Sequence, residues 1–361
     1  MTIENLLDQP FVYWMSSGAQ DGDIVLASRI RLARNLEGIP FPQRANGEQL
    51  SQVVSQLKNS LCEMNFCDLN IDGQPEYMFI DLEKLPLLER LVLVEKHIIS
   101  PDHAREAGNR ALIVKHDTTV SIMVNEEDHL RIQCLMPGLN LVEAFTSANQ
   151  VDDIIESKHT LAFNEDLGYL TSCPTNLGTG LRASVMVHLP ALVLTGQINR
   201  IVNAVTQLGL TVRGLYGEGT EAVGNIFQIS NQLTLGFTEQ EIIDNLYSVV
   251  KQVVDHERTA RGGLYAETTD MLVDKVWRSY GTLKYARSIS GQEALALLSD
   301  VRMGYELGII NEVSDCNFNE LMVVTRPNFL QKMSDRSELS GNERKSLRAK
   351  VIRDKFTQEG K

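Results

Sequence analysis

A cysteine, two glycines and an arginine lie close together in the segment Cys173–Ser184, which reads CPTNLGTGLRAS. Glycine lets a backbone approach a ligand closely, arginine binds phosphate through several N–H donors, and cysteine is either a reactive group or a small buried residue. The combination predicts a phosphate site with a reactive group at its edge. The segment is neither a Walker loop nor a G-x-G-x-x-G turn, so a different phosphate chemistry is required.

Arg29 and Arg31 form a second cationic pattern, within the segment Asp23–Asn35 (DIVLASRIRLARN). Apolar and polar residues alternate there, which predicts a half-buried strand. Residues two apart on a strand point to the same face, so the two guanidinium groups would repel each other unless an anion lies between them. Two readings stay open: a clamp for a polyphosphate, or a solvated sheet face on which carboxylates pair with the arginines.

Three consecutive acidic residues lie in the segment Asn125–Arg131, NEEDHLR. Most acidic triplets are solvated turns. In an extended chain, however, Glu127, His129 and Arg131 would share one face, and the other two acids would take the opposite face. A carboxylate and an arginine on one face could bind a cationic and an anionic substrate side by side.

A further carboxylate, Glu218, lies between Gly217 and Gly219 and follows Arg213 at the end of an expected strand. The flanking glycines indicate a mobile loop that can close over a ligand. The alternative is a plain loop whose glutamate points to water.

The elements that must position these groups follow from the hydrophobic pattern. In the first 255 residues, expected hairpins with interspersed helices favour an α+β fold with an antiparallel sheet over a βαβ pattern. From about residue 255 the pattern is nearly all helical. We therefore predict a catalytic domain over residues 1–255 and a helical C-terminal domain over residues 256–361, joined at the polar segment 255–265. Four capping boxes predict helix starts at Asn140, Thr238, Ser290 and Ser340.

Composition narrows the class of protein. The chain has 361 residues, of which 43% are hydrophobic and 22% charged, as in soluble globular proteins. A net charge of −13 argues against a protein that coats nucleic acid. The five cysteines are scattered without a C-x-x-C pair, which argues against a structural zinc or a disulfide framework and suits a reducing cytoplasm. No secretory signal and no membrane-spanning run is expected.

Taken together and in this order, the four motifs resemble the catalytic core of the phosphagen (guanidino) kinases, the arginine and creatine kinase family. The resemblance covers roughly residues 20–255 and includes GNIFQISN after the Glu218 loop. Metabolic members carry a helical region before the arginine strand that helps to bind a small guanidine, whereas here that strand begins near residue 24. The chain continues instead into C-terminal helices. This plan resembles the bacterial protein-arginine kinases (McsB type) over essentially the whole chain.

The resemblance implies an ATP-dependent phosphotransferase that acts on guanidinium groups. It implies that Glu127 and Glu218 hold the target guanidinium and that Cys173 lies beside it as a thiolate, which nearby cations would favour. The nucleotide would be MgATP, with Mg²⁺ held mainly through the phosphates and no metal site of the protein's own. The ATP-binding residues would be Ser28, Arg29, Ile30, Arg31, Leu32, His97, Arg131, Arg182, Ala183, Ser184, Val185, Met186, Arg213, Gly214, Leu215, Tyr216 and Gly217. For His97, which follows an apolar helical run, a core position is the alternative.

The family's C-terminal phosphoarginine-binding motif, Arg-Asp-x-x-Arg-Ala, corresponds here to Arg344–Ala349. The resemblance implies that Arg344 and Arg348 bind phosphoarginine. Lys345 stands where the motif has an acid, and a lysine would repel the guanidinium part of the ligand. We therefore expect a pocket that binds a phosphate more loosely or has lost its ligand.

Three functions stay open from the sequence: a protein-arginine kinase, a kinase for free arginine or another small guanidine, and a non-catalytic phosphoarginine-binding adaptor. The short N-terminal region favours the first over the second, and the presence of Glu127, Glu218 and Cys173 argues against the third. The resemblance further implies a homodimer and a role in stress response and protein quality control. Its implied partners are protein substrates with exposed arginines, including a heat-shock transcription repressor, a zinc-binding activator protein and a Clp ATPase/protease.

Overall fold

The computed structural model describes residues 2–63, 76–215, 222–311, 318–334 and 336–358. The chain divides into two compact units. Unit 1 comprises Met1–Ser16, Ala27–Ser184 and Ser230–Tyr247, and unit 2 comprises Ser17–Leu26, Val185–Ile229 and Ser248–Lys361. Within the described ranges, no helix combines the length and the apolar character that crossing a membrane requires.

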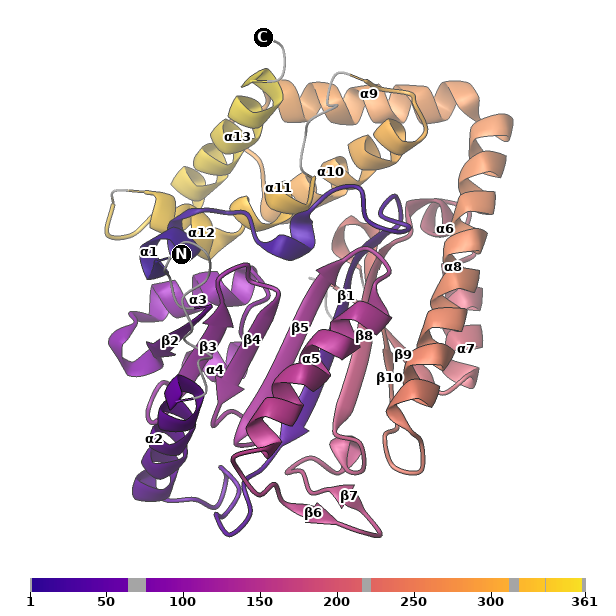
Figure 1. Cartoon of the computed structure of the whole chain (residues 1–361). Helices are drawn as coiled ribbons and strands as arrows, with labels where there is room; N and C mark the ends of the chain where they lie inside the picture. Colours follow the sequence, from indigo (N-terminus) through magenta and orange to yellow (C-terminus); the bar gives the residue numbers. More distant parts are fainter. Residues whose placement is uncertain (1, 64–75, 216–221, 312–317, 335, 359–361) are drawn as a thin grey trace. The chain divides into compact units, whose positions relative to one another are not determined.

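An eight-stranded sheet has the strand order β2-β3-β4-β5-β1-β8-β10-β9 (Figure 1). The pairs β1/β5, β2/β3, β3/β4 and β4/β5 are antiparallel, which confirms the predicted α+β class. Two short strands, β6 and β7, form a separate hairpin. The strands are β1 Val25–Arg34, β2 Tyr77–Asp81, β3 Ala111–Lys115, β4 Val120–Val124, β5 Leu130–Pro137, β6 Phe163–Asn164, β7 Gly168–Tyr169, β8 Leu181–His188, β9 Leu210–Gly214 and β10 Ile226–Asn231.

Strand β1 confirms the strand that was predicted over residues 23–35. Every residue of β1 is buried except Arg29 and Arg31, which are intermediate in exposure. Strand β4, which lies on the other side of β5, is buried at all five positions, so both faces of the sheet are covered there. Arg29 and Arg31 are therefore the only partly exposed side chains of β1, and they leave the sheet at one restricted place.

Unit 1 also holds short helices and two longer ones. They are α1 Ile3–Asp8, η1 Tyr13–Met15, α2 Gly47–Glu63, η2 Leu82–Lys84, α3 Leu87–Glu95, α4 Pro101–Arg105, α5 Leu141–Glu156 and η3 Pro174–Asn176. Helix α5 lies along β5 (Figure 1) and buries residues at helical spacing, namely Leu141, Ala144, Ala148, Val151 and Ile155.

The helix start predicted at Asn140 in unit 1 is confirmed, but its capping box is not. Asn140 is the N-cap of α5, but its side chain makes no capping hydrogen bond. Its amide Nδ2 donates instead to the Pro137 carbonyl at 2.6 Å, back toward the end of β5. The other three capping boxes are confirmed, because Thr238, Ser290 and Ser340 each exchange hydrogen bonds with the glutamate three residues later.

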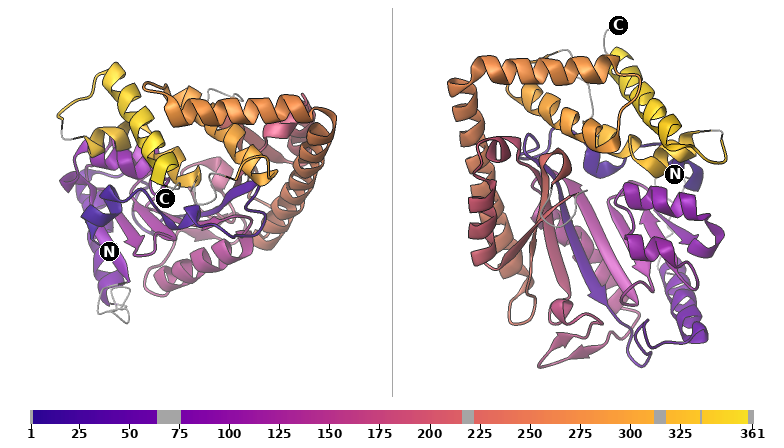
Figure 2. Two further views of the ribbon diagram at one scale, coloured as in Figure 1. Left: turned by 90° about the horizontal axis from the view of Figure 1, so that it is seen from above. Right: turned by 180° about the vertical axis from the view of Figure 1, so that it is seen from behind.

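Unit 2 is mostly helical. Its helices are α6 Pro190–Leu194, α7 Ile198–Gln207, η4 Val223–Asn225, α9 Thr269–Tyr285, α10 Gly291–Glu306, α11 Phe318–Val324, α12 Pro327–Met333 and α13 Gly341–Gln358, together with most of α8 Glu239–Glu267. Helices α9 and α10 lie side by side (Figure 2), and a Cβ at Gly304 would come within 2.3 Å of Val276. The segment 255–265, where we expected a polar junction, is helical throughout as part of α8.

Candidate active site

Four arginine side chains gather on one face of the sheet in unit 1. Arg29 and Arg31 leave β1 on the same face, as predicted. Arg131 of β5 pairs with β1 two positions beyond Arg31, so it shares that face. Arg182 precedes Ser184 by two positions on β8, and the Ser184 hydroxyl accepts a hydrogen bond from Arg29 Nε at 3.2 Å. Three strands thus bring four predicted phosphate-binding residues together.

Burial and mutual repulsion disfavour the charged forms of these arginines. Burial, followed by the charges of Arg131 and Arg182, lowers the pKa of Arg29 to about 10. The pKa of Arg31 lies well below its usual value because of burial and the other three arginines, and only Glu126 opposes this. Among the described residues, the buried Nε of Arg31 has no hydrogen-bond partner. Such a cluster fits a ligand with several negative charges, because the ligand would relieve the repulsion.

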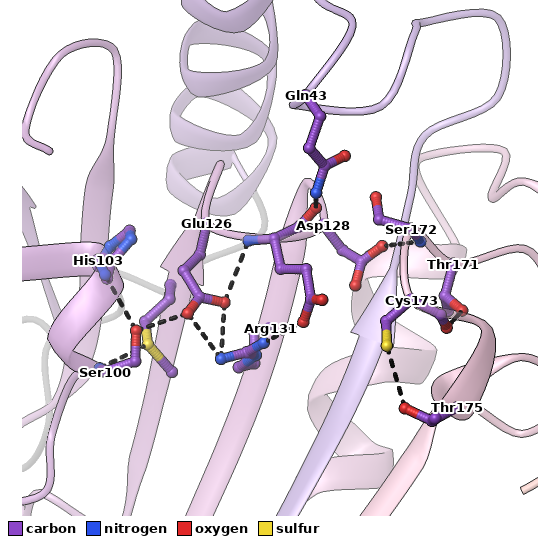
Figure 3. Close-up of polar contacts among 12 residues, drawn as sticks. Gln43, Ser100, His103, Glu126, Asp128, Arg131, Thr171, Ser172, Cys173 and Thr175 are labelled. Carbon is purple, nitrogen blue, oxygen red and sulfur yellow. Dashed lines mark hydrogen bonds and ion pairs between the residues drawn. The ribbon is translucent and has the colours of Figure 1, made fainter.

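Two carboxylates hold Arg131 from the turn that precedes it. Glu126 is 7% exposed and binds Arg131 Nη1 at 2.6 and 2.7 Å (Figure 3). It also accepts a hydrogen bond from the Ser100 hydroxyl at 2.5 Å. Glu127 binds Arg131 Nη2 at 2.9 Å, and its side chain is 37% exposed. Glu126 is therefore committed to the fold, whereas Glu127 keeps an exposed side for a ligand.

Of the two readings of the segment 125–131, the turn is confirmed and the extended chain is wrong. Asn125 has a positive φ of 58°, and its N–H donates to the His129 carbonyl, so the chain turns here. The turn brings both Glu126 and Glu127 to Arg131, rather than placing them on opposite faces. His129 is buried, where its Nδ1 accepts from the Leu36 N–H at 3.1 Å, so it supports the fold instead of facing the arginine cluster.

Glu127 and Cys173 are neighbours. Burial raises the pKa of the Glu127 carboxyl, and Arg131 and the nearby Cys173 thiol oppose the rise. The Cys173 Sγ lies 3.0 Å from the Thr175 hydroxyl (Figure 3). A partly exposed carboxylate and a thiol therefore stand together beside the arginine cluster, which suits a planar cation with several N–H donors.

Asp128 connects the Glu127 turn to the Cys173 loop. One of its oxygens, Oδ1, accepts from Asn35 Nδ2 at 2.7 Å and from the Ser172 N–H at 2.7 Å. Asn35 completes the connection, because its side-chain oxygen accepts from the His129 N–H at 2.9 Å. Asp128 is 1% exposed, so these bonds are shielded from water. The relative position of Glu127 and Cys173 is thus fixed by a buried hydrogen-bond network.

Arg34, at the end of β1, holds the loop that carries Cys173 at Thr179. Its guanidinium is paired with Asp152 of α5, with Nη2 and Oδ2 2.6 Å apart. Its Nη1 donates to the Thr179 carbonyl at 3.0 Å, and its Cζ lies 3.5 Å from the centre of the Tyr169 ring. Burial raises the pKa of Asp152, and Arg34 opposes the rise. This arginine is a positioning residue for the loop.

The glycines of the loop that carries Cys173 allow close packing within the protein. Gly178 and Gly180 have positive φ angles of 107° and 66°. A Cβ at Gly180 would come within 2.5 Å of Arg34 Nη1, and one at Gly178 within 2.9 Å of the Leu235 Cα. The close approach that the glycines allow is to the protein's own atoms.

Several other predicted residues do not share the arginine face. Ser28, Ile30 and Leu32 alternate with the arginines on β1 and are at most 1% exposed. The Ser28 hydroxyl donates to the Gly138 carbonyl at 2.8 Å and accepts from the N–H of Asn140. Any contact of these three residues with a nucleotide would therefore have to come from their backbone.

On β8, Ala183, Val185 and Met186 are also buried. The Ala183 N–H is already used, because it donates to the side-chain oxygen of Asn231 at 2.8 Å. His97 packs edge-on against Trp14, with ring centroids 5.6 Å apart, and its carbonyl accepts from Gln133. It also has a positive φ of 62°.

Arg213, Gly214 and Leu215 belong to unit 2, where Arg213 is an exposed residue of β9. Tyr216, Gly217 and the predicted catalytic Glu218 lie outside the described residues.

The C-terminal residues expected to bind phosphoarginine lie on α13. Arg348 is buried and donates to the carbonyls of Thr325 and Ile289 at 2.8 and 3.1 Å. Arg344 donates to the Leu339 carbonyl at 3.3 Å, and Lys345 is exposed. At least two of the N–H donors of Arg348 are therefore engaged with the backbone of unit 2.

Sequence reasoning missed Arg34, Asn35, Glu126 and Asp128 as residues that shape the site. The only local signal was their position in the sequence. Glu126 and Asp128 flank Glu127, and Arg34 and Asn35 follow the predicted arginine pair. Their partners lie far away in the sequence, as with Arg34 and Asp152, which are 118 positions apart.

Comparisons with known proteins identify the family of the chain. A family described as "ATP:guanido phosphotransferase, C-terminal catalytic domain" matches residues 57–260, and one described as "Protein-arginine kinase McsB C-terminal domain" matches residues 269–361. The chain is 51% identical to a protein-arginine kinase of Bacillus subtilis (strain 168), covering 99% of this chain and 96% of that protein. It is 46% identical to a protein-arginine kinase of Desulforamulus reducens, covering 99% and 98%.

Among solved structures, a crystal structure of lombricine kinase has a similar fold. The TM-score is 0.57 at 26% sequence identity, and the match covers 72% of this chain and 76% of that one.

Proposed function

The chain belongs to the protein-arginine kinases, within the ATP:guanido phosphotransferases, and from this premise we propose how its side chains act. The reaction transfers the γ-phosphoryl group of ATP to the guanidinium of arginine side chains in proteins. The observation that carries the proposal is the pairing of Glu127 with Cys173 beside the cluster of Arg29, Arg31, Arg131 and Arg182.

The arginine cluster would bind the nucleotide phosphates. Burial and repulsion already disfavour the charges of Arg29 and Arg31, and a triphosphate would offset both effects. In the part of the chain that is described, no group of three or more His, Cys, Asp and Glu side chains could hold a metal ion. Mg²⁺, held through the phosphates, would neutralise charge on the transferring group. A single arginine in such a role is worth about 10³–10⁵ in rate.

The proton on the target arginine limits the chemistry. Its pKa of about 13 means that deprotonation at neutral pH would cost roughly 8 kcal/mol before any N–P bond forms. Glu127 alone cannot remove this proton in the ground state, although burial raises its pKa and so makes it a better acceptor than an exposed glutamate. We therefore infer that the proton leaves late, as the N–P bond forms and the bond from phosphorus to the ADP oxygen breaks.

Alignment is then the main task of Glu127 and Cys173. Their side chains would accept hydrogen bonds from the guanidinium N–H groups and hold the attacking nitrogen in line with the phosphoryl group. Fixing two reactants in this way can be worth about 7–11 kcal/mol. Glu218 is proposed as the second carboxylate, on the strength of the family resemblance alone. The hydrogen bonds of Asp128 support this role, because they keep Glu127 and Cys173 at a set separation.

Other parts of the assignment are proposals that rest on the resemblance. The proposed domains are a catalytic one over residues 1–255 and a helical one over residues 256–361; the two family matches cover residues 57–260 and 269–361. We propose a cytoplasmic homodimer that marks proteins for Clp-type proteolysis, acts on a heat-shock repressor and responds to a zinc-binding activator. The free thiols of Cys134 and Cys173 suit a reducing compartment. Arg344 and Arg348 are proposed for phosphoarginine only in a weakened pocket, because Lys345 stands nearby.

The direct test is to incubate the protein with MgATP and either an arginine-containing protein or free arginine, and to record ³¹P NMR spectra. We expect an acid-labile N–P signal on the protein substrate. A signal on free arginine alone would favour the small-guanidine kinase, and no signal with either substrate would favour the phosphoarginine-binding adaptor.

Variants at the paired side chains test the mechanism. Glu127→Gln and Cys173→Ala should each lower turnover strongly, by about 10²–10⁴ for the carboxylate, while the dissociation constant for ATP stays within a few-fold. Glu143→Gln is the matched control, because Glu143 is exposed on α5 of the same unit. Full activity of Cys173→Ala would remove the thiol from the mechanism.

A further inference from the structure

A cleft of about 270 Å³ lies in unit 1 beside the loop that carries Cys173. Three segments line it: the β6–β7 hairpin, residues 178–179 of the loop, and residues 234–239 between β10 and α8. Its volume is just below the roughly 300–1,000 Å³ of sites for small organic ligands. The size suits one or two side chains of a polypeptide better than a nucleotide.

The lining exposes large apolar side chains. Phe163, Leu167, Leu235 and Phe237 are 56%, 42%, 48% and 51% exposed. An apolar cluster with this much contact to water is typical of an interaction surface, and aromatic residues are enriched in the centres of such surfaces. None of these side chains has a task in the phosphate site.

The cleft is built rigidly onto the loop of the active site. A Cβ at Gly168 would come within 2.5 Å of the Gly178 carbonyl oxygen, and one at Gly178 within 2.9 Å of the Leu235 Cα, so the three segments touch through their backbones. The Thr234 hydroxyl lies 2.6 Å from the Leu177 carbonyl and 3.1 Å from that of Thr175. A ligand in the cleft would therefore be held at a fixed place relative to Cys173.

The distance between the cleft and the reacting group is limited by the chain itself. Gly178 lines the cleft and follows Cys173 by only five positions. Five residues span at most about 18 Å. An extended peptide covers that distance in about five residues, at about 3.3 Å each. One polypeptide can thus reach both places.

The charge of the cleft selects among possible occupants. The described residues that line it include two carboxylates, Asp166 and Glu239, and no Lys or Arg. Acidic groups around an apolar centre repel nucleic acid and anionic lipid, whereas they attract a segment that carries arginine together with apolar side chains.

We propose that this cleft binds the substrate polypeptide, accepting a large apolar side chain about five residues from the arginine that is phosphorylated. The inference rests on the proposed function, because the target arginine at Glu127 and Cys173 fixes where the polypeptide passes. Folded proteins bury most large apolar side chains, so a docking site of this kind selects extended or unfolded segments. The substrate class is therefore exposed chain in which an aromatic or aliphatic residue accompanies an arginine.

The test is a binding experiment without ATP. Two fluorescent peptides each carry one arginine, separated by five residues from either phenylalanine or serine, and anisotropy gives their dissociation constants. Burial of the ring should make the phenylalanine peptide bind wild-type protein about tenfold more tightly. Leu235→Ser and Phe237→Ser should remove this preference. Leu87→Ser should keep it, because Leu87 is a matched control on α3 with 50% exposure against 48% for Leu235.

Equal affinity of the two peptides for wild-type protein, or an unchanged preference in both cleft variants, would overturn the inference. So would variants that alter the sedimentation of the protein but not its peptide preference, since the cleft would then be a contact between copies of the chain. Each variant is first checked by thermal unfolding, which should be unchanged because the replaced side chains are about half exposed.

The outcome is separate from that of the phosphotransfer assay. A protein that forms the N–P bond yet binds both peptides equally would remove the docking inference alone. A protein that prefers the phenylalanine peptide yet forms no N–P bond would support the cleft as a polypeptide site and remove the proposed reaction.

Discussion

The middle and the C-terminal end of strand β1 hold arginines in opposite situations. Arg34, at its C-terminal end, is buried and paired with Asp152, and it donates to two backbone carbonyls and faces the Tyr169 ring. Arg29 and Arg31, a few residues earlier, lie among other arginines that lower their pKa. All three side chains are of one type on one strand of ten residues.

The difference distinguishes Arg34, whose charge stabilises the fold, from Arg29 and Arg31, whose charges are available to a ligand. Removing one member of a buried ion pair leaves the other without compensation and destabilises a protein. Removing one of several repelling charges does not have that effect, but it weakens an anion site. The same substitution at these two places on β1 should therefore change different properties: folding at Arg34 and catalysis at Arg31.

The largest effect should come from Arg31→Ala. Turnover with a protein substrate should fall about 10³–10⁵-fold, the range for an arginine that stabilises a transferring phosphoryl group. The free energy of unfolding without nucleotide should not decrease, because the variant relieves repulsion from three other arginines. Steady-state kinetics and urea denaturation measure the two quantities. Loss of stability comparable to that in Arg34→Ala would abolish the distinction between Arg31 and Arg34.

Arg34→Ala should act in the opposite way and mainly lower stability. We expect the free energy of unfolding to fall by about 3–5 kcal/mol, because Asp152 would be left buried and unpaired. Urea denaturation measures the change. The double variant Arg34→Leu/Asp152→Leu should recover most of the loss, since it removes both charges. If the single variant were as stable as wild type, the pair would not anchor the loop.

The smallest effect is a shift in pH dependence. Burial raises the pKa of Glu127, so protonation of its carboxylate begins at a higher pH than for an exposed glutamate, which titrates near about 4.3. As pH falls, turnover should therefore decline earlier than an exposed carboxylate would allow. The pH profile of turnover, restricted to the range in which circular dichroism shows a folded protein, measures this. Glu127→Gln is the control and should lack that decline; its persistence would assign it to another group.

Much of the fold could be predicted because its signals are local. Alternation over residues 23–35 gave strand β1 and placed Arg29 and Arg31 on one face, and three of the four capping boxes were confirmed. The carboxylate and thiol were also identified from short motifs. Their contact with each other comes from the folded chain, since 46 positions separate Glu127 from Cys173.

The wrong predictions arise where several side chains or backbone groups compete to contact the same residue, which a short motif does not show. An extended segment 125–131 ignores the turn that Asn125 makes, which gives Arg131 two carboxylates instead of one. The sequence also cannot show that Arg34 and residue 235 closely approach the glycines at 178 and 180, so their packing role was not predicted. The Asn140 side chain donates to the Pro137 carbonyl instead of capping the helix N-terminus.

The single oxygen of Asp128 that accepts from both Asn35 and Ser172 has a consequence for protein engineering. The thiol and the carboxylate of the site share an anchor, so neither can be moved without the other. A chimera that received residues 170–180 from a distant relative would need compatible residues at 35 and 128 as well, and exchange of the loop alone should yield a folded but misaligned catalyst.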